Sequence, residues 1–334
     1  MSRKYSLAPT FAAALFGILV GLLPAAAQTK IAIGTAKDPN LAAQLIIARD
    51  KGFFTEAGLD ATISDFPSGG DLMAAFVGGS VQIGTAGATP VITLGARPFP
   101  IAIVAQVSDI SGAQQLIVHE GVDSLEQLYG KKIGVLKGTA SEALFNSIEN
   151  AYDLDPSKFE IVNLGPTEML QTFVRNQVDA VALWEPHSTR AREAGKGKTL
   201  VSGTTSFIPG KEGPRRVYGD HAVLFTSQDF AQKNADTIKK VITAIDKANE
   251  YLKSNHKEAV EILAKAFQLT SGQMDHIVDV NDYTLLIDEQ MILDMNKLSS
   301  FLAALNKIPT GVDVRSWMST AALKSIAPNM VKLK

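Results

Sequence analysis

Cysteine is absent from all 334 residues of the chain. Its absence excludes disulfide bonds, thiolate metal sites, cysteine nucleophiles and a lipid attached to an N-terminal cysteine. An excess of charge of one sign is also missing, because 32 basic and 34 acidic residues give a formal net charge of −2. This balance provides no electrostatic footprint for nucleic acid, so we expect no nucleic-acid partner.

Motifs of the common enzyme classes are lacking as well. The sequence has no Gly-x-Ser-x-Gly elbow, no complete Gly-x-x-x-x-Gly-Lys-Ser/Thr phosphate loop and no Gly-x-Gly-x-x-Gly fingerprint. The five histidines have no partner at a spacing typical of metal ligands. We therefore expect no catalytic residue, no metal and no cofactor, and we predict that the protein is not an enzyme.

The first 27 residues have the pattern of an export signal. A short basic start, Ser2-Arg3-Lys4, precedes an almost wholly apolar run from Leu7 to Leu23, and Ala25-Ala26-Ala27 fits the small-residue rule for cleavage. The alternative is an uncleaved membrane anchor, but the apolar run is short for a span of roughly 20 residues. We expect cleavage after Ala27 and a mature, periplasmic chain that begins at Gln28.

Short β-type runs alternate with helical runs over the first two thirds of the chain. This alternation predicts an α/β fold in which parallel strands are joined by crossover helices. The expected strands are 31–34, 60–65, 81–85, 100–107, 114–118, 132–136, 159–163, 179–183, 199–202 and 221–226. The expected helices are 39–51, 69–78, 89–96, 124–129, 139–151 and 166–176.

The last third is mostly helical in pattern. Apolar residues recur at helical spacing from Ile238 to Leu252, from Ala259 to Phe267 and from Met291 to Leu302. A Gly/Pro/Ser-rich stretch from Ser202 to Gly219 precedes this region and reads as a surface loop before the chain re-enters a sheet.

Four loop-to-helix junctions carry start signals. They are Asp38-Pro39, Ser68 with Asp71, Thr89-Pro90, and Thr139 with Glu142, the last fitting a capping box. In a parallel open sheet such junctions gather at the carboxyl ends of the strands, where ligands bind. Free N–H groups at helix starts suit an anion. The alternative, for each junction taken singly, is a helix cap with no ligand.

At these residues the chain resembles the periplasmic solute-binding proteins of the sulfonate/taurine/nitrate uptake systems. Four pieces in matching order carry the resemblance. They are Ala48 through Gly52-Phe53-Phe54 to Leu59, Gly84 to Pro90, Tyr129-Gly130-Lys131 through Val135 to Thr139, and Val178-Asp179-Ala180-Val181 with Trp184-Glu185-Pro186. The resemblance implies a two-lobed periplasmic-binding-protein fold, type II-like, in which each lobe is a mostly parallel sheet flanked by helices, with a helical C-terminal region.

The resemblance also implies the division of the chain and the residues of the cleft. Lobe one would hold 29–113 and 215–334, and lobe two 114–214, with two crossing segments as the hinge. The implied ligand-binding residues are Thr35, Ala36, Lys37, Ser68, Gly69, Gly87, Ala88, Thr89, Gln106, Lys137, Gly138, Thr139, Ser141, Trp184, Glu185, His187, Asp220 and His221. We expect Ser141 to offer a free hydroxyl, and Glu185 to be either a partner for a cationic solute group or a helix-start acid.

Three functions remain open at this point. The first is the binding component of an ABC importer, a monomer that takes a small anionic solute to an inner-membrane permease and its ATPase. A sulfonate of the taurine type is favoured because no Arg falls in the loops 34–38, 66–70, 84–89 or 137–141. Nitrate, an aromatic acid or a pyrimidine are alternatives on the same scaffold. The second function is a related enzyme of thiamine-pyrimidine synthesis, and the third is a sensory module.

Overall fold

A five-stranded sheet organises the first half of the molecule. The computed structural model describes Met1 and residues 28–334, so the expected signal segment lies outside the described residues. The strand order is β2 (Leu59–Phe66), β1 (Thr29–Ala36), β3 (Ile83–Gly87), β12 (His221–Ser227) and β4 (Ile101–Asp109). β1 is parallel to β2 and to β3, whereas β12 is antiparallel to both of its neighbours.

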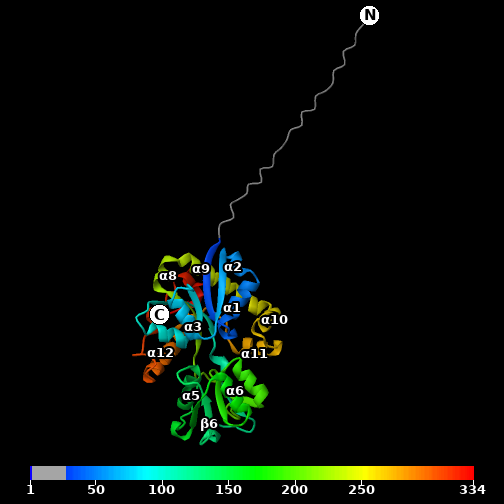
Figure 1. The fold of residues 1–334 in the computed structure, drawn as a ribbon, viewed down its shortest axis with the longest axis vertical. Helices are drawn as coiled ribbons and strands as arrows, with labels where there is room; N and C mark the ends of the chain where they lie inside the picture. Colours follow the sequence, from blue (N-terminus) through cyan, green and yellow to red (C-terminus); the bar gives the residue numbers. More distant parts are fainter. Residues whose placement is uncertain (2–27) are drawn as a thin grey trace.

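A seven-stranded sheet organises the second half. Its order is β11 (Gly213–Pro214), β10 (Thr205–Ser206), β9 (Gly197–Ser202), β5 (Gln114–His119), β8 (Ala180–Trp184), β6 (Lys132–Val135) and β7 (Glu160–Asn163). The pairs β6/β7 and β6/β8 are parallel, and β5 is antiparallel to β8 and β9. We call the unit around the first sheet the first lobe and the unit around this sheet the second lobe (Figure 1).

Helices surround both sheets. Those of the first lobe are α1 (Pro39–Asp50), α2 (Phe53–Glu56), α3 (Gly69–Val77), α4 (Ala88–Gly95), α8 (Gln228–Lys233), α9 (Ala235–Ser254), α10 (His256–Phe267), α11 (Ser271–Val280), α12 (Glu289–Ala304) and α13 (Ala321–Ile326). Those of the second lobe are α5 (Ala140–Ala151), α6 (Pro166–Val174) and α7 (His187–Gly195). A small pair of strands, β13 (Ile287–Asp288) and β14 (Val331–Lys332), lies near the C-terminus.

The chain crosses between the sheets at two segments that bind each other. One is the turn after β4, which includes a 3-10 helix over Ser111–Ala113, and the other leads into β12. The amide of Ile110 donates to the carbonyl of Asp220 over 3.0 Å, and the amide of Asp220 donates to the Ser111 hydroxyl over 2.9 Å. These bonds hold the two connections side by side. The strands that they lead into, β5 and β12, are antiparallel to their neighbours.

The first lobe packs the helical region against its sheet as the apolar spacing predicted. Ile238, Val241, Ile245 and Leu252 of α9 are all buried, and α9 packs along α1. Because β2 and β3 lie on opposite sides of β1, right-handed crossovers place α1 and α3 on opposite faces of the sheet (Figure 1). None of the helices over the described residues is both long enough and apolar enough to cross a membrane.

Two of the four predicted helix starts are confirmed as written. The Asp38 carboxylate accepts from the amide of Asn40 over 2.8 Å, and the Ser68 hydroxyl accepts from the amide of Asp71 over 3.1 Å. The predicted start at Thr89-Pro90 is wrong, because α4 already begins at Ala88 and Gly87 is its cap residue. Its first turn therefore has no side-chain cap.

The helix start predicted at Thr139 is at the right residue, but the hydrogen bonds predicted for its capping box are wrong. The Thr139 hydroxyl accepts from the amide of Ser141 over 3.3 Å, not from that of Glu142. The Glu142 carboxylate accepts from the amide of Gly138 over 2.7 Å, one residue before the cap. The predicted helix over 124–129 is a single 3-10 turn, Glu126–Leu128, because Tyr129 takes an extended backbone conformation and ends the run.

Candidate functional site

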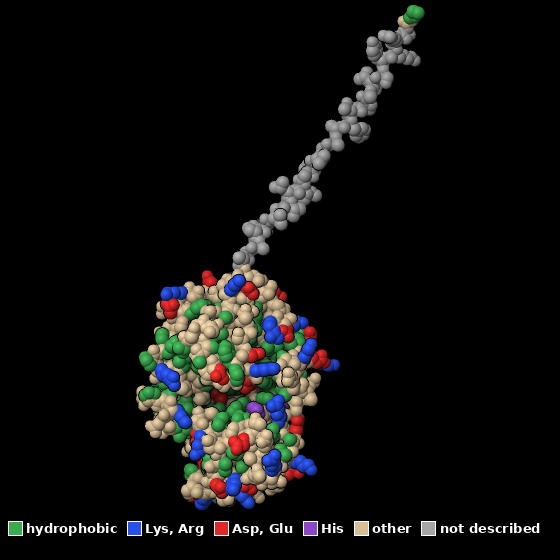
Figure 2. Space-filling model, viewed as in Figure 1, with side chains coloured by type: hydrophobic (Ala, Val, Ile, Leu, Met, Phe, Trp, Pro, Cys, Tyr) green, Lys and Arg blue, Asp and Glu red, His purple; other side chains and the backbone are tan. Residues whose placement is uncertain are grey.

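A large cavity lies between the two lobes, at the carboxyl ends of β1, β2 and β3. Its volume is about 1090 Å³. In the space-filling view an apolar hollow separates the large upper body from the small lower one (Figure 2). The position agrees with the sheet edge at which the sequence predicted a site.

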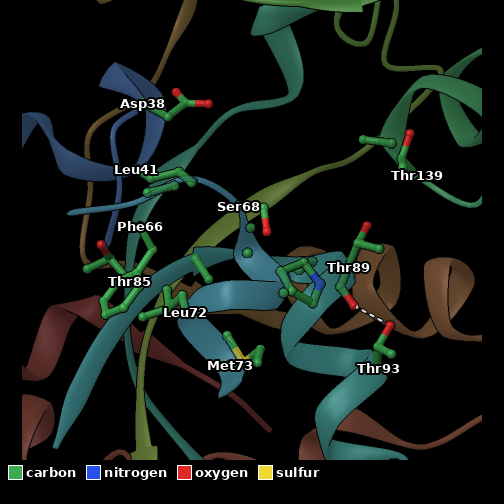
Figure 3. A pocket seen from close by; sticks show the side chains of 18 of the residues that line it. Asp38, Leu41, Phe66, Ser68, Leu72, Met73, Thr85, Thr89, Thr93 and Thr139 are labelled. Atoms are coloured by element: carbon green, nitrogen blue, oxygen red, sulfur yellow. Dashed lines mark hydrogen bonds between the residues drawn. The ribbon is translucent and has the colours of Figure 1, made fainter. Parts of the chain in front are cut away.

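The first lobe forms most of the wall. Apolar side chains from α1, β2, α3 and α4 line it, including Leu41, Phe66, Leu72, Met73 and Leu94. The starts of α1, α3 and α4 also face the cavity, and Ser68 and Thr89 project into it (Figure 3). Gly69 at the start of α3 touches Pro90 so closely that a Cβ there would lie 2.8 Å from Pro90 Cγ. The two helix starts are thereby held side by side.

The second lobe forms a smaller opposite wall. Thr139 and Ala140 from the start of α5, Pro166 from the start of α6, and Trp184 and His187 from the end of β8 and the start of α7 line it. The rings of Trp184 and His187 meet edge to face, with centroids 5.8 Å apart. Burial lowers the pKa of His187, and the charge of Arg190 adds to this. The imidazole of His187 and the indole of Trp184 thus face the apolar wall across the gap.

Two carboxyl groups line the cavity where the lobes join. Burial raises the pKa of Asp38 to about 6, although two hydrogen bonds from Asn40 oppose the rise. Burial also raises the pKa of Asp220 to about 7, and the negative charges of Asp109 and Asp294 add to it. Gln114, at the start of β5, lines the same region and is 3 % exposed.

The structure brings together most of the residues that the resemblance implied. Those that line the cavity are Ala36, Lys37, Ser68, Gly69, Gly87, Ala88, Thr89, Thr139, Trp184, His187 and Asp220. They come from both lobes and from the second crossing segment. Contact of each with a solute remains a prediction.

Ser141 and Glu185 do not line the cavity, because the fold already satisfies their polar atoms. The Ser141 hydroxyl donates to the carbonyl of Ala182 over 2.6 Å and accepts from the amide of Leu136 over 3.0 Å. The Glu185 carboxylate pairs with Arg192 over 3.1 Å. Burial alone would raise the pKa of Glu185, but the nearby imidazole of His276, 3.3 Å away, the charge of Arg192 and hydrogen bonds from neighbouring groups outweigh it and lower that pKa to about 2.

Five other predicted residues also lie outside the lining. The imidazole of His221 joins Gln106 Oε1, 2.9 Å away, to Asp294 Oδ2, 3.1 Å away, in a buried cluster under the crossing. The hydroxyl of Thr35 accepts from that of Thr85 over 2.7 Å. The remaining two are Lys137, whose amide donates to Asn163 over 2.9 Å, and Gly138, which lies against the stem of Lys307. The cavity lies at the predicted sheet edge, but these residues do not line it.

The sequence reading missed several lining residues. Asp38 was interpreted only as a cap, and Gln114 only as the start of a strand, although both face the cavity. Phe66 could have been found from its place at the end of a predicted strand. Arg97 lines the rim beyond α4, outside the loops in which arginine was found to be absent.

Two α/β lobes joined by two crossings around an interlobe cavity define the periplasmic-binding-protein fold. The chain belongs to the family described as "NMT1/THI5 like", whose sequence model matches residues 39–259, more than half of the chain. The taurine-binding periplasmic protein of Escherichia coli is 27 % identical over 265 residues, which cover 77 % of this chain and 78 % of that protein.

Solved structures agree with this fold. The periplasmic aliphatic sulphonate binding protein SsuA from Escherichia coli superposes with a TM-score of 0.75 at 19 % identity, covering 86 % of this chain and 96 % of that one. The periplasmic nitrate-binding protein NrtA from Synechocystis superposes with a TM-score of 0.67 at 17 % identity, covering 91 % of this chain and 89 % of that one. The α/β two-lobed fold predicted from the sequence is therefore confirmed. The strand pairing differs from the mostly parallel sheet expected in each lobe, because β12 is antiparallel to both of its neighbours and only the pairs β6/β7 and β6/β8 are parallel in the second sheet. The strands that enter from the crossing segments, β5 and β12, run against the strands beside them.

Proposed function

We propose that the protein is the periplasmic substrate-binding component of an ABC importer. It binds a small, anionic solute between its lobes and delivers it to an inner-membrane permease with its ATPase. The observation that carries this proposal is the cavity of about 1090 Å³ at the carboxyl ends of β1, β2 and β3, with Thr139, Trp184 and His187 of the other lobe opposite. A ligand that touches both walls stabilises their closed arrangement, which is the signal that a permease can read.

The chemistry of the walls supports an organic anion. The starts of α3 and α4 present backbone N–H groups and the positive end of a helix dipole, which favour an oxyanion. Much of the remaining wall is apolar, so a solute with a hydrocarbon body gains more from burial than nitrate does. We favour a sulfonate of the taurine type, as the names of the relatives also suggest, and keep an aromatic acid, a pyrimidine or nitrate as alternatives.

Lobe boundaries at 29–113 with 215–334, and at 114–214, are part of the proposal. The strands of the first sheet all lie in the first set of residues and those of the second sheet in the other, which supports this division. The hinge is then the pair of crossing segments. We propose that the protein is monomeric, and that neither a related thiamine-pyrimidine enzyme nor a sensory module describes it better.

A solute screen tests the function. Thermal shift with sulfonates, nitrate, carboxylates and pyrimidines should identify a stabilising ligand, and calorimetry should give its affinity. A hundredfold excess over the dissociation constant should add about 2.7 kcal/mol to the free energy of unfolding. The radius of gyration from solution scattering should fall with ligand if the lobes close. No binding by any class, or turnover of a bound solute, would contradict the proposal.

A further inference from the structure

Gln114 is a buried side chain with one polar atom left over. Its Nε2 donates to Asp220 Oδ2 over 3.1 Å, while its Oε1 is buried and has no hydrogen-bond partner. Gln114 is the first residue of β5, beside Trp184 on β8, and it lines the interlobe cavity together with Asp220. A buried acceptor without a donor is unfavourable, so this atom points to a donor that arrives with a ligand.

The hydrogen bond to Asp220 uses the NH₂ group of the Gln114 amide and leaves the amide oxygen free. The ionised form of Asp220 favours this orientation, because a carboxylate only accepts hydrogen bonds. Asp220 Oδ1 accepts a further bond from the amide of His221 over 3.0 Å. Gln114 Oε1 and the Asp220 carboxylate are therefore the acceptors at this end of the cavity.

Asp220 also lacks a cationic partner. It takes part in no ion pair among residues 28–334. The nearby guanidinium of Arg216 is already shared by Asp109, 3.0 Å away, and Asp294, 2.7 Å away. The imidazole of His221 is turned toward Gln106 and Asp294 instead. An ammonium group brought by a solute can therefore act as the ion-pair partner of Asp220.

We infer that this end of the cavity selects a solute with a protonated amino group, which donates to Gln114 Oε1 and to the Asp220 carboxylate. The inference rests on the proposed function and deepens it. The anionic end of the solute lies at the helix starts of the first lobe, its apolar body against Leu72 and Met73, and its ammonium at the crossing segments. The role that the sequence left open for Glu185 passes to Asp220, because Glu185 already has Arg192 as its cation.

Matched pairs of solutes test the inference by calorimetry. The pairs are 2-aminoethanesulfonate with ethanesulfonate, and 4-(aminomethyl)benzenesulfonate with 4-methylbenzenesulfonate. In at least one pair the aminated member should bind roughly tenfold or more tightly, as expected for a hydrogen bond to a charged group. Equal or tighter binding of the unaminated members overturns the inference and leaves the proposed function intact. If no member of either pair binds while another anion does, the inference also fails and the proposed function stands.

Two variants assign the effect to these side chains. Asp220→Asn keeps the shape and the acceptor for the His221 amide, and Gln114→Met removes the free oxygen without adding charge. Each variant should lower the affinity for the aminated solute roughly tenfold. The affinity for the unaminated partner solute should stay within about twofold of that of the natural protein. Asp65→Asn removes an exposed carboxylate outside the cavity and is the control for net charge. It should change neither the affinity for the aminated solute nor that for the unaminated one. Melting curves without solute confirm folding, and an equal loss for both members of a pair overturns the assignment.

Discussion

His276 on α11 reaches Glu185 on the second lobe: its Nε2 lies 3.3 Å from Glu185 Oε1. The same carboxylate accepts from the amide of Thr189 over 3.1 Å and pairs with Arg192, whose Nη2 is 3.1 Å away. The helical C-terminal region of the first lobe is thus connected to the start of α7 in the second. Glu185 is fully buried, which makes these contacts structural.

Glu185→Gln should destabilise the protein. The amide keeps the shape of the side chain but removes the charge that offsets Arg192, so we expect a loss of about 2–3 kcal/mol in the free energy of unfolding. Urea unfolding followed by tryptophan fluorescence measures it. The matched control is Glu193→Gln in α7, an exposed carboxylate that accepts from Gln273 Nε2 over 2.7 Å. The new amide oxygen can still accept this bond, so the control should cost less than about 0.5 kcal/mol. Equal effects of the two variants would contradict the structural role.

The pH dependence of unfolding should carry the same signature. The pKa of Glu185 falls from an ordinary 4.5 to about 2 in the folded protein. Because the pKa is lower in the folded state, the unfolded state binds the proton first as pH falls. The contribution of ionised Glu185 to the free energy of unfolding is therefore complete above pH 4.5 and is lost as pH falls toward 2. Acid-unfolding curves should show a smaller loss over this window for Glu185→Gln than for the natural protein. Parallel curves would show that Glu185 is not ionised in the fold.

Ser141→Ala should affect stability and spare solute binding. The substitution leaves the amide of Leu136 and the carbonyl of Ala182 without partners in a buried place, at a cost of about 1–3 kcal/mol. Affinity for the best solute should stay within about twofold because the side chain is outside the cavity lining. Chemical unfolding and calorimetry on one preparation separate the two readouts. A large loss of affinity with unchanged stability would return Ser141 to the binding site.

Tryptophan emission should report solute binding through one residue. The chain has two tryptophans, Trp184 in the cavity lining and Trp317, which packs against Gly95 at the end of α4. Trp317→Phe should keep the ligand-dependent change in emission, and Trp184→Phe should remove most of it. Because an aromatic wall contributes apolar contact area, Trp184→Phe should also weaken binding several-fold. A signal that follows Trp317 instead would place the solute elsewhere.

The sequence predicted the fold better than it predicted the site, for a physical reason. The spacing of apolar residues records which face of a strand or helix is buried. Elements predicted in this way are present in the structure for β1 to β9 and for α9. The helix α7 was missed because its sequence, His187–Gly195, is mostly polar and shows little apolar spacing. Which side chain of a loop turns into the cavity depends on partners distant in sequence. Ser141 is held by Ala182, and Gln106 by His221, and no local pattern records such contacts.

Mass spectrometry of the exported protein should give a chain that starts at Gln28 and carries no lipid. The reason is the Ala25-Ala26-Ala27 triplet and the absence of cysteine. β1 begins at Thr29, so cleavage at this point leaves the first strand whole. Substituting Ala25 and Ala27 by Gln should block cleavage and retain the precursor. Recovery of intact residues 1–27 from the natural protein in a membrane fraction would contradict the prediction.

Affinity for an aminated solute should rise with pH through the titration of Asp220. Burial raises the pKa of Asp220 to about 7 in the empty cavity, opposed by the adjacent His221 and reinforced by Asp109 and Asp294. An ammonium group binds the ionised carboxylate better, so binding should release a proton and lower that pKa. Between pH 5.5 and 8 the affinity should therefore increase roughly tenfold or more, as long as the amine stays protonated.

The rise above pH 6.5 distinguishes Asp220 from the other titrating group of the cavity wall. Asp38 has a pKa of about 6 and is mostly ionised at pH 6.5. Any increase in affinity that comes from its ionisation therefore occurs at lower pH. In Asp220→Asn the affinity for the aminated solute should no longer rise above pH 6.5 but should still rise below it. The affinity for the unaminated partner solute should not rise with pH. Calorimetry in two buffers of different ionisation enthalpy should detect a larger proton release near pH 7 for the natural protein than for Asp220→Asn. A curve that keeps its upper rise in Asp220→Asn would assign the proton to another group.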